Sequence, residues 1–335
     1  MPEASARVAR MMARTIVFSW KLMAAAVMLA AGVACAAAQG PAADAYIVVD
    51  THANRVLMAG NAGKKRPVAS LTKIATACVV LDWAERTSTD LGRQATVPPS
   101  AAQLQPNPFG FAPGDTISLR DALCCAMMGS DNIAAETLAW HVGADIQRRT
   151  GRSGTPFSLF VKEMNKLAAY LKMKDTKFLN PHGLDNASAV PYSTAADMAR
   201  LTIYAQKKPA FGFYTSQADR RVTYYKQSGG NQSFLLKNTN TLVGRSGIDG
   251  VKTGTTARAG QCLILSATRK SYVQKLSPVR NNVFPRRLVT VILGAQDRFR
   301  DGQWLLDQGW ARQEQWNAHG RPTPAHTELL DPPSQ

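Results

Sequence analysis

β-prone apolar segments lie near both ends of this 335-residue chain, with most of its length between them. Residues 46–49 and 55–58 are short β-prone runs joined by a turn-rich connection, which predicts an antiparallel hairpin. Residues 261–268 and 288–293 are again apolar and rich in β-branched side chains. Strands at both ends with helices between them predict one antiparallel sheet that is assembled from distant segments and covered by helices.

Helical patterns occupy the region between the predicted strands. From Ser70 to Trp83, apolar side chains recur every three or four residues and mark the buried face of a helix. Similar patterns occur at residues 119–128, 132–142, 157–171 and 195–206, and a closing helix is predicted at 298–310. The segment from about 84 to 250 is therefore predicted to be mostly helical, and the fold class is α+β.

Residues 1–38 have the order of charge and hydrophobicity that is typical of an export signal. Basic residues between 7 and 21 precede an apolar stretch at 22–34, and the alanines at 36–38 supply a small-residue cleavage site. The apolar stretch is too short to favour a membrane-spanning helix. We therefore expect a cleaved signal peptide and a mature protein in the periplasm or elsewhere outside the cytoplasm, with no stable membrane anchor. Lipid attachment at Cys35 is a less favoured alternative.

The charge balance is strongly basic, with 40 Lys and Arg against 23 Asp and Glu and a net charge of +17. Such an excess favours polyanionic partners, but export and the absence of a zinc-finger or aromatic-rich RNA-binding pattern argue against nucleic acid. The cysteines beyond the signal, at 78, 124, 125 and 262, lie within apolar runs and are predicted to be buried free thiols. Without a Cys-x-x-Cys pair or paired histidines, no metal site and no cofactor are expected.

Three short motifs occur once each and in order: Ser-Leu-Thr-Lys at 70–73, Ser-Asp-Asn at 130–132 and Lys-Thr-Gly at 252–254. Residues three apart on a helix share a face, so the Lys73 amine lies within reach of the Ser70 hydroxyl. A serine needs a base, and a lysine acts as one only when desolvation or a cationic neighbour lowers its pKa. Singly, Ser70 could be a helix-capping serine, Lys73 a surface lysine and residues 252–254 a turn. Together, the three motifs favour nucleophilic catalysis by Ser70.

The sequence around these motifs resembles the low-molecular-weight penicillin-binding proteins, the serine D-alanyl-D-alanine carboxypeptidase family, in which this trio is found. The similar stretches are RPVASLTKIAT, MNKLAAYLKMKDTKFLNPHGLD, YSTAADMARL and NTNTLVGRSGIDGVKTGTTARAG. The resemblance covers residues 44–310, the expected catalytic domain, and leaves 311–335 as a tail that is predicted to be disordered. It implies a β-lactamase/transpeptidase-like fold, in which an antiparallel sheet flanked by helices meets a mostly helical lobe at the active site.

The resemblance also implies catalytic roles. Ser70 would be the acylated nucleophile and Lys73 its general base, while Ser130 would relay a proton to the leaving amine. The backbone N–H groups of Ser70 and Thr255 would form the oxyanion hole. The implied enzyme is an exported DD-carboxypeptidase that removes the terminal D-Ala from peptidoglycan stem peptides through a Ser70 acyl-enzyme and is covalently inhibited by β-lactams.

Five further residues would bind the substrate, namely Asn132, Lys252, Thr253, Gly254 and Thr255. Within this set, Asn132 would hydrogen-bond the substrate amide, and Lys252 and Thr253 would hold its carboxylate. The same residues would serve a DD-endopeptidase that cleaves peptidoglycan cross-links, which is the alternative function. A β-lactamase and a non-catalytic wall-binding module are less favoured alternatives.

The sequence departs from the family pattern at three places. Asp131 stands where these carboxypeptidases usually have Gly, and Thr255 stands where several have His. The segment 270–287 is long and basic and contains no acid, so it is predicted to be a solvated loop, with contact to a wall polymer as the alternative. His182, in the loop sequence NPHG, is predicted to be structural rather than a catalytic base.

Overall fold

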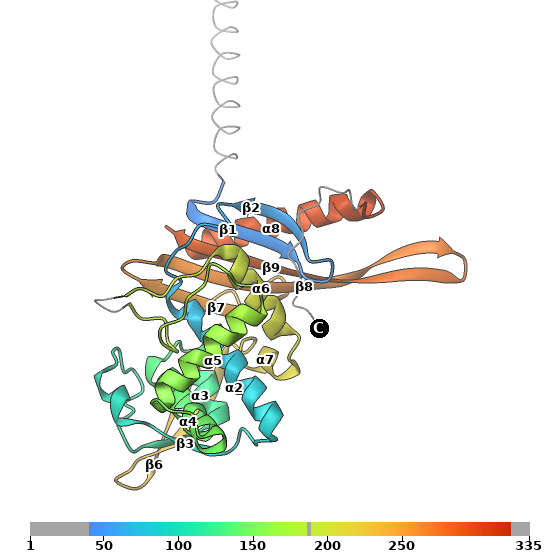
Figure 1. Cartoon of the computed structure of the whole chain (residues 1–335). Helices are drawn as coiled ribbons and strands as arrows, with labels where there is room; N and C mark the ends of the chain where they lie inside the picture. The colour runs from blue at the N-terminus through green and yellow to red at the C-terminus, as the bar shows by residue number, and fades with distance from the viewer. Residues whose placement is uncertain (1–39, 186–188, 323–335) are drawn as a thin grey trace, which may run out of the picture. The chain divides into compact units, whose positions relative to one another are not determined.

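A five-stranded antiparallel sheet joins the two ends of the chain in the computed structural model, which describes residues 40–185 and 189–322 (Figure 1). Its strands are β1 (Ala43–Asp50), β2 (Arg55–Gly60), β7 (Ile248–Thr256), β8 (Gly260–Ser277) and β9 (Arg280–Ala295). They lie in the order β2-β1-β9-β8-β7, and every neighbouring pair is antiparallel. The predicted N-terminal hairpin and the predicted assembly from distant segments are both confirmed.

Helices cover both faces of this sheet, which is why its central strands are apolar on both sides. Alternate residues of one strand enter different clusters: Ile47 and Val49 pack with the helical lobe, whereas Val48 packs with Leu306 and Trp310 of the C-terminal helix. A strand that is buried on both faces has a continuous apolar run instead of the alternation of a half-exposed strand. The sheet therefore forms the boundary between two hydrophobic clusters.

The helical lobe packs around one central helix, α2 (Lys73–Thr87). The other helices are α3 (Leu119–Met127), α4 (Asn132–Thr150), α5 (Pro156–Tyr170), α6 (Ala195–Gln206), α7 (Pro209–Phe213) and α8 (Arg298–Ala318), with 3-10 turns η1 (Ala69–Thr72) and η2 (Pro99–Gln103). Every residue of α2 from Lys73 to Leu81 is buried. The predicted helices are present, and α2 has the central position that such complete burial requires.

A second sheet corrects the prediction that the middle region is mostly helical. It has four strands in the order β3 (Gln94–Thr96), β4 (Thr116–Ser118), β5 (Asp219–Tyr225) and β6 (Asn231–Lys237). These strands are short or polar, and β5 and β6 bury only Val222, Tyr224 and Leu236. Such strands lack the apolar runs by which the strands of the larger sheet were predicted.

A two-stranded ribbon replaces the loop that was predicted at 270–287. Strands β8 and β9 stay paired beyond the larger sheet, with Tyr272 opposite Phe284 and Val273 opposite Val283, and they turn between Ser277 and Arg280. Figure 1 shows this ribbon extending past the end of the sheet. The loop prediction is wrong because aromatic and β-branched residues face one another across the two strands and stabilise their pairing.

Helix α8 continues to Ala318, so the predicted tail does not begin at 311. Gln313 and Trp316 are buried, and the Gln313 Nε2 donates a 2.7 Å hydrogen bond to the Oδ2 of Asp50, the last residue of β1. The predicted signal peptide, and the tail from residue 323 onwards, lie outside the described residues. Within the described segments, no helix has the length and apolar character that a bilayer crossing needs.

The four described cysteines are free and buried, as predicted. Burial is the main cause that raises the pKa of each thiol above its ordinary value. Cys124 and Cys125 are adjacent in α3, and Cys78 and Cys262 lie in α2 and β8. These thiols are therefore small apolar core residues in the folded protein.

The end of α8 generates a stability prediction. Gln313→Ala is expected to lower the free energy of unfolding by about 1–3 kcal/mol, because the buried Asp50 carboxylate loses a donor. Urea unfolding measures this difference, with Gln315→Ala as the control, since Gln315 is an exposed glutamine on the same helix. Equal losses in the two variants would show that the contact between α8 and the end of β1 does not stabilise the fold.

Candidate active site

Ser70 lies in the 3-10 turn η1, and the α-helix itself begins three residues later at Lys73. The sequence placed Ser70 at the start of the α-helix, so the structure refines that prediction. The turn is held by a hydrogen bond from the Leu71 N–H to the Val68 carbonyl, and Ala69 has a positive φ of 48°. This backbone leaves Ser70 half-buried, with its hydroxyl on the side of the Lys73 amine.

Lys73 is fully buried and donates three hydrogen bonds. Its Nζ lies 2.9 Å from the Ser70 Oγ, 2.8 Å from the Asn132 Oδ1 and 2.9 Å from the main-chain oxygen of His182. Three acceptors match the three N–H bonds of an ammonium, and loss of one proton would leave a lone pair for the Ser70 hydroxyl. Burial lowers the pKa of Lys73 to about 7, against the opposing charge of Asp131.

The second motif lies at the start of α4. Ser130 has a positive φ of 62°, and Asp131 caps the helix by accepting a 2.6 Å hydrogen bond from the Ala134 N–H. Burial raises the pKa of Asp131 to about 6, while the bond from Ala134 and the charge of Lys73 act in the opposite direction. Asn132, the first residue of α4, faces Lys73, so the motif contributes both a neutral acceptor and a carboxyl group to the surroundings of the buried amine.

The third motif lies on β7, an edge strand of the larger sheet. A Cβ atom added at Gly254 would lie 3.0 Å from the Ser70 backbone nitrogen, so a side chain there would press on the Ser70 turn and glycine relieves this crowding. The Thr253 Oγ1 lies 2.7 Å from the Thr239 Oγ1, which donates to the main-chain oxygen of Met128, two residues before Ser130. The structure thus brings all three motifs together around Ser70.

Two basic side chains lie at the third motif: Lys252, which belongs to it, and Arg298, which contacts it. Lys252 is buried, and its burial, followed by the charges of Lys73 and Arg298, lowers its pKa well below the ordinary value. Arg298, at the start of α8, donates a 2.8 Å hydrogen bond to the Gly254 carbonyl. Sequence analysis missed Arg298 because it lies in no motif. Thr255 follows on β7 with an exposed side chain, so its place in the site depends on its backbone.

The loop after residue 179 also contacts the Ser70 turn. Gly183 has a φ of +84°, and a Cβ atom there would overlap the carbonyl of Ala69. The Gly183 N–H donates a 2.6 Å hydrogen bond to the Asn180 Oδ1, which closes the loop. Burial and the charge of Lys73 lower the pKa of His182 to about 3, so its ring is neutral and its main-chain oxygen is the part that binds Lys73. No residue-type pattern predicts such a main-chain contact.

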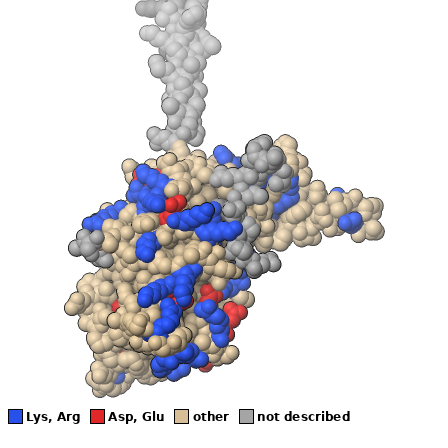
Figure 2. Space-filling view, viewed as in Figure 1, with Lys and Arg blue, Asp and Glu red and all other residues tan. Residues whose placement is uncertain are grey.

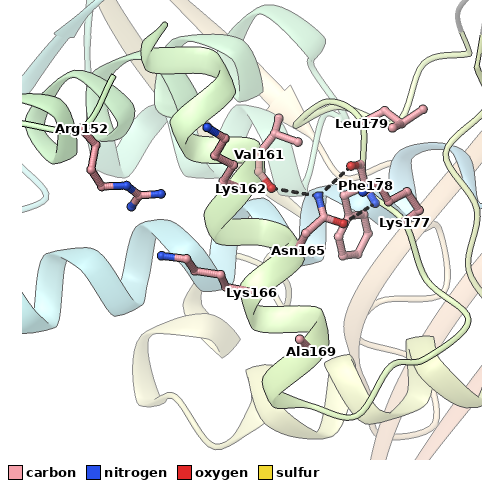
Figure 3. Close-up of a pocket in the computed structure, with 9 residues that line it drawn as sticks. All are labelled: Arg152, Val161, Lys162, Asn165, Lys166, Ala169, Lys177, Phe178 and Leu179. Carbon is pink, nitrogen blue, oxygen red and sulfur yellow. Dashed lines mark hydrogen bonds between the residues drawn. The ribbon is translucent and has the colours of Figure 1, made fainter. Parts of the chain in front are cut away.

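A separate pocket lies over α5 and contains none of the motif residues (Figure 3). Its volume is about 580 Å³, and it is lined by Arg152, Val161, Lys162, Asn165, Lys166, Ala169, Lys177, Phe178 and Leu179. The Asn165 side chain donates to the main-chain oxygen of Phe178 and accepts from its N–H, at 2.8 and 3.0 Å. Asn165 therefore fixes the segment that leads into the loop at 180–183. Within the described residues, no cluster of His, Cys, Asp and Glu could hold a metal ion.

Comparison with known proteins identifies relatives over most of the chain. The profile of peptidase family S11, D-alanyl-D-alanine carboxypeptidase, matches residues 33–279. The chain is 31% identical over 264 residues to the D-alanyl-D-alanine endopeptidase of Escherichia coli K12, covering 75% of this chain and 77% of that protein. It is 32% identical over 283 residues to the D-alanyl-D-alanine carboxypeptidase DacC of the same strain, covering 81% and 62%.

Solved structures share the fold. Penicillin-binding protein D2 of Listeria monocytogenes, in its cefotaxime-bound form, is 27% identical with a TM-score of 0.62 over 81% of this chain and 98% of that chain. The DD-transpeptidase of Streptomyces K15 is 24% identical with a TM-score of 0.68 over 82% and 98%. The expected α+β fold of the transpeptidase type is confirmed.

The contact of the loop with the Ser70 turn generates a prediction. Gly183→Ala is expected to lower the free energy of unfolding by about 1–3 kcal/mol, because the added methyl group meets the Ala69 carbonyl at a strained φ. Gly229→Ala is the matched control, since Gly229 also has a positive φ, of 98°, but faces open space. If both variants lose the same stability in urea, backbone strain alone explains the effect and the contact contributes nothing.

Proposed function

Because the chain belongs to the D-alanyl-D-alanine carboxypeptidase family of serine peptidases, we propose that it removes the terminal D-Ala from peptidoglycan stem peptides. The observation that carries this proposal is the 2.9 Å hydrogen bond between the Ser70 Oγ and the buried Lys73 Nζ. A lysine whose pKa is close to neutral is deprotonated in a substantial fraction of molecules at pH 7. It can then accept the proton that a serine must lose to become a nucleophile.

In the first step, the Ser70 Oγ attacks the carbonyl carbon of the penultimate D-Ala, and its proton passes to the Lys73 Nζ. The oxyanion receives hydrogen bonds from the backbone N–H groups of Ser70 and Thr255. Gly254 precedes Thr255 on β7 and packs closely on the Ser70 backbone nitrogen. The absence of a side chain there allows β7 and the Ser70 turn to approach each other. Fixed donors of this kind stabilise the tetrahedral intermediate because they need no reorganisation during the reaction.

In the second step, Ser130 relays a proton to the amine of the departing D-Ala, and the C–N bond breaks to leave an ester on Ser70. Water then attacks this ester, releases the shortened stem peptide and restores the Ser70 hydroxyl. Asn132 has the double role of holding Lys73 and binding the substrate amide, which its position at the start of α4 permits. The proposed reaction needs no cofactor.

Substrate binding follows from the charge and from the sheet edge. The Arg298 guanidinium favours the terminal carboxylate of the substrate, and the Lys252 amine and the Thr253 hydroxyl can each donate a hydrogen bond to it. β7 is an edge strand, and an extended peptide can pair with such an edge through main-chain hydrogen bonds. A β-lactam presents a carboxylate and a reactive carbonyl to the same groups, and we propose that it acylates Ser70. The proposed place of action is the periplasm or another extracytoplasmic compartment.

DD-endopeptidase activity is the second candidate. Proteins named D-alanyl-D-alanine endopeptidase, from Escherichia coli and Pseudomonas aeruginosa, match this chain at 31% and 32% identity over 77% and 67% of their length. Six proteins named carboxypeptidase match at 27–32% identity over 54–72% of theirs. Both activities use the same acyl-enzyme and differ in whether the leaving amine belongs to a free D-Ala end or to a cross-link.

The proposal predicts a covalent adduct with benzylpenicillin. Intact-mass spectrometry of the exported protein is expected to show one added drug mass, and Ser70→Ala is expected to show none. Defined muropeptides then separate the two activities: loss of D-Ala from a monomeric pentapeptide indicates the carboxypeptidase, and cleavage of a cross-linked dimer indicates the endopeptidase. An unmodified protein with intact drug would contradict the enzymatic proposal, and drug consumption without an adduct would indicate a β-lactamase.

The lowered pKa of Lys73 predicts the pH dependence of acylation. Because the neutral amine is the base, the acylation rate is expected to rise with pH, about tenfold per unit, and to level off above about pH 7. In Asp131→Asn the amide can still cap α4, but the charge that raises the pKa of Lys73 is lost. The rising limb should therefore move to lower pH.

Stopped-flow acylation with a chromogenic cephalosporin from pH 5 to 9 measures the rising limb and the plateau in each variant. Asp121→Asn is the control, because Asp121 lies in the first turn of α3 and is paired with Arg220 instead. A limb that stays in place in Asp131→Asn, or moves equally in both variants, would contradict the proposed coupling between Asp131 and Lys73.

A further inference from the structure

The ribbon formed by residues 269–287 of β8 and β9 has one face that is held by the C-terminal helix. Tyr272 and Phe284 stack on this face, and the Tyr272 hydroxyl donates to the main-chain oxygen of Asn317 at the end of α8. The Arg321 guanidinium lies 4.3 Å from the centre of the Phe284 ring. A two-stranded hairpin needs such packing to be stable in water. The base of the ribbon is therefore fixed to the body of the catalytic domain.

The opposite face and the tip expose apolar side chains. The cross-strand pair Val273 and Val283 is 49% and 60% exposed, and at the tip Leu276 is 48% and Val279 is 95% exposed. Four large apolar side chains on one short ribbon are unusual for a surface that only contacts water. Because the core is complete without them, their exposure indicates a binding surface.

The charges on the ribbon divide into two groups. At the base, Arg286 and Arg287 are already paired with Glu314 and Asp249, at 2.6 and 2.7 Å. Lys270 at the base, and Lys275 and Arg280 nearer the tip, are exposed and form no ion pair with any described residue. No acidic residue occurs between 270 and 287. In the space-filling view, the ribbon accordingly shows blue and tan but no red (Figure 2).

We propose that this ribbon is a peripheral membrane-contact arm, which binds the surface of a bilayer rich in anionic phospholipid. The free cations would meet the lipid phosphates, and Leu276 and Val279 would enter the boundary between headgroups and acyl chains. Exposed apolar residues beside basic ones are the combination that binds at this boundary. A polar wall polymer would use the cations but would leave Val279 in water, so the bilayer accounts for both features.

A second basic surface provides a matched comparison. The pocket over α5 has Lys162, Lys166 and Lys177 among its lining residues (Figure 3). Lys166 is paired there with Glu163, which also binds Arg152. Substitution of these three lysines removes three positive charges from the pocket. Substitution of the three unpaired cations removes the same number from the ribbon. A general attraction between a basic protein and anionic lipid would depend on both surfaces, whereas the proposed arm depends on the ribbon alone.

The test is co-sedimentation of the exported protein with phosphatidylglycerol-containing vesicles and with phosphatidylcholine vesicles. Mass spectrometry first verifies that all variants begin at the same residue. We expect binding to the anionic vesicles only, weakened by added salt. The charge variant Lys270→Gln/Lys275→Gln/Arg280→Gln should lose about a hundredfold in partition coefficient. The apolar variant Leu276→Ser/Val279→Ser should lose about tenfold.

Two control variants change the same chemistry elsewhere. Lys162→Gln/Lys166→Gln/Lys177→Gln removes three lysines from the pocket, and Leu235→Ser removes an exposed leucine from β6. Both controls should bind vesicles like the unchanged protein. The ribbon variants should have the melting temperature of the unchanged protein and its rate of labelling by benzylpenicillin. These two measurements separate a loss of membrane binding from a loss of the active site.

Several results would overturn the proposal. These are the absence of vesicle binding, equal losses in the ribbon and pocket variants, and retention of binding in the apolar variant. Ribbon-dependent sedimentation with purified sacculi but not with vesicles would assign the ribbon to a wall polymer. A dimer in light scattering that Leu276→Ser/Val279→Ser converts to a monomer, without vesicle binding, would assign it to a second copy of the chain.

Discussion

The burial of one amine, that of Lys73, is the constraint on which the rest of the site depends. Removal of an ammonium from water is costly unless its donors find acceptors. Here the acceptors come from three separate parts of the chain: Ser70 in η1, Asn132 in α4 and the main-chain oxygen of His182. The helical lobe can be understood as the arrangement that brings these segments around the start of α2 and excludes water from it.

The larger sheet supplies the other half of the site. Its edge strand β7 packs against the Ser70 turn at Gly254, and Thr253 is linked through Thr239 to the main chain just before Ser130. The sheet is buried between two clusters, and this edge strand packs into both, through Val251 on the side of the lobe and Ile248 on the side of α8. Fixed positions matter for acyl transfer, since donors that are already in place stabilise the developing charge without a reorganisation cost.

The sequence predicted the strands and helices whose apolar pattern is complete, together with the residues that lie in motifs. It failed where the stabilising contact depends on the tertiary structure. β5 and β6 are too polar to be recognised, and the ribbon was assigned to a loop because its charge and length outweighed its aromatic and β-branched pairs. Arg298 and Thr239 bind main-chain or hydroxyl groups of distant segments, and His182 acts through its carbonyl. None of these contacts requires a particular residue spacing, so only the folded chain reveals them.

The four buried thiols have a consequence for the biogenesis of the protein. A thiol reacts with oxidants and disulfides as its thiolate, and burial suppresses both the thiolate and access to it. In an oxidising compartment such cysteines remain reduced only if the chain folds before an oxidase reaches them. Cys124 and Cys125 are neighbours in α3, whereas Cys78 and Cys262 come from opposite ends of the catalytic domain. In such a compartment, correct maturation would depend on core formation being faster than the formation of mispaired disulfides.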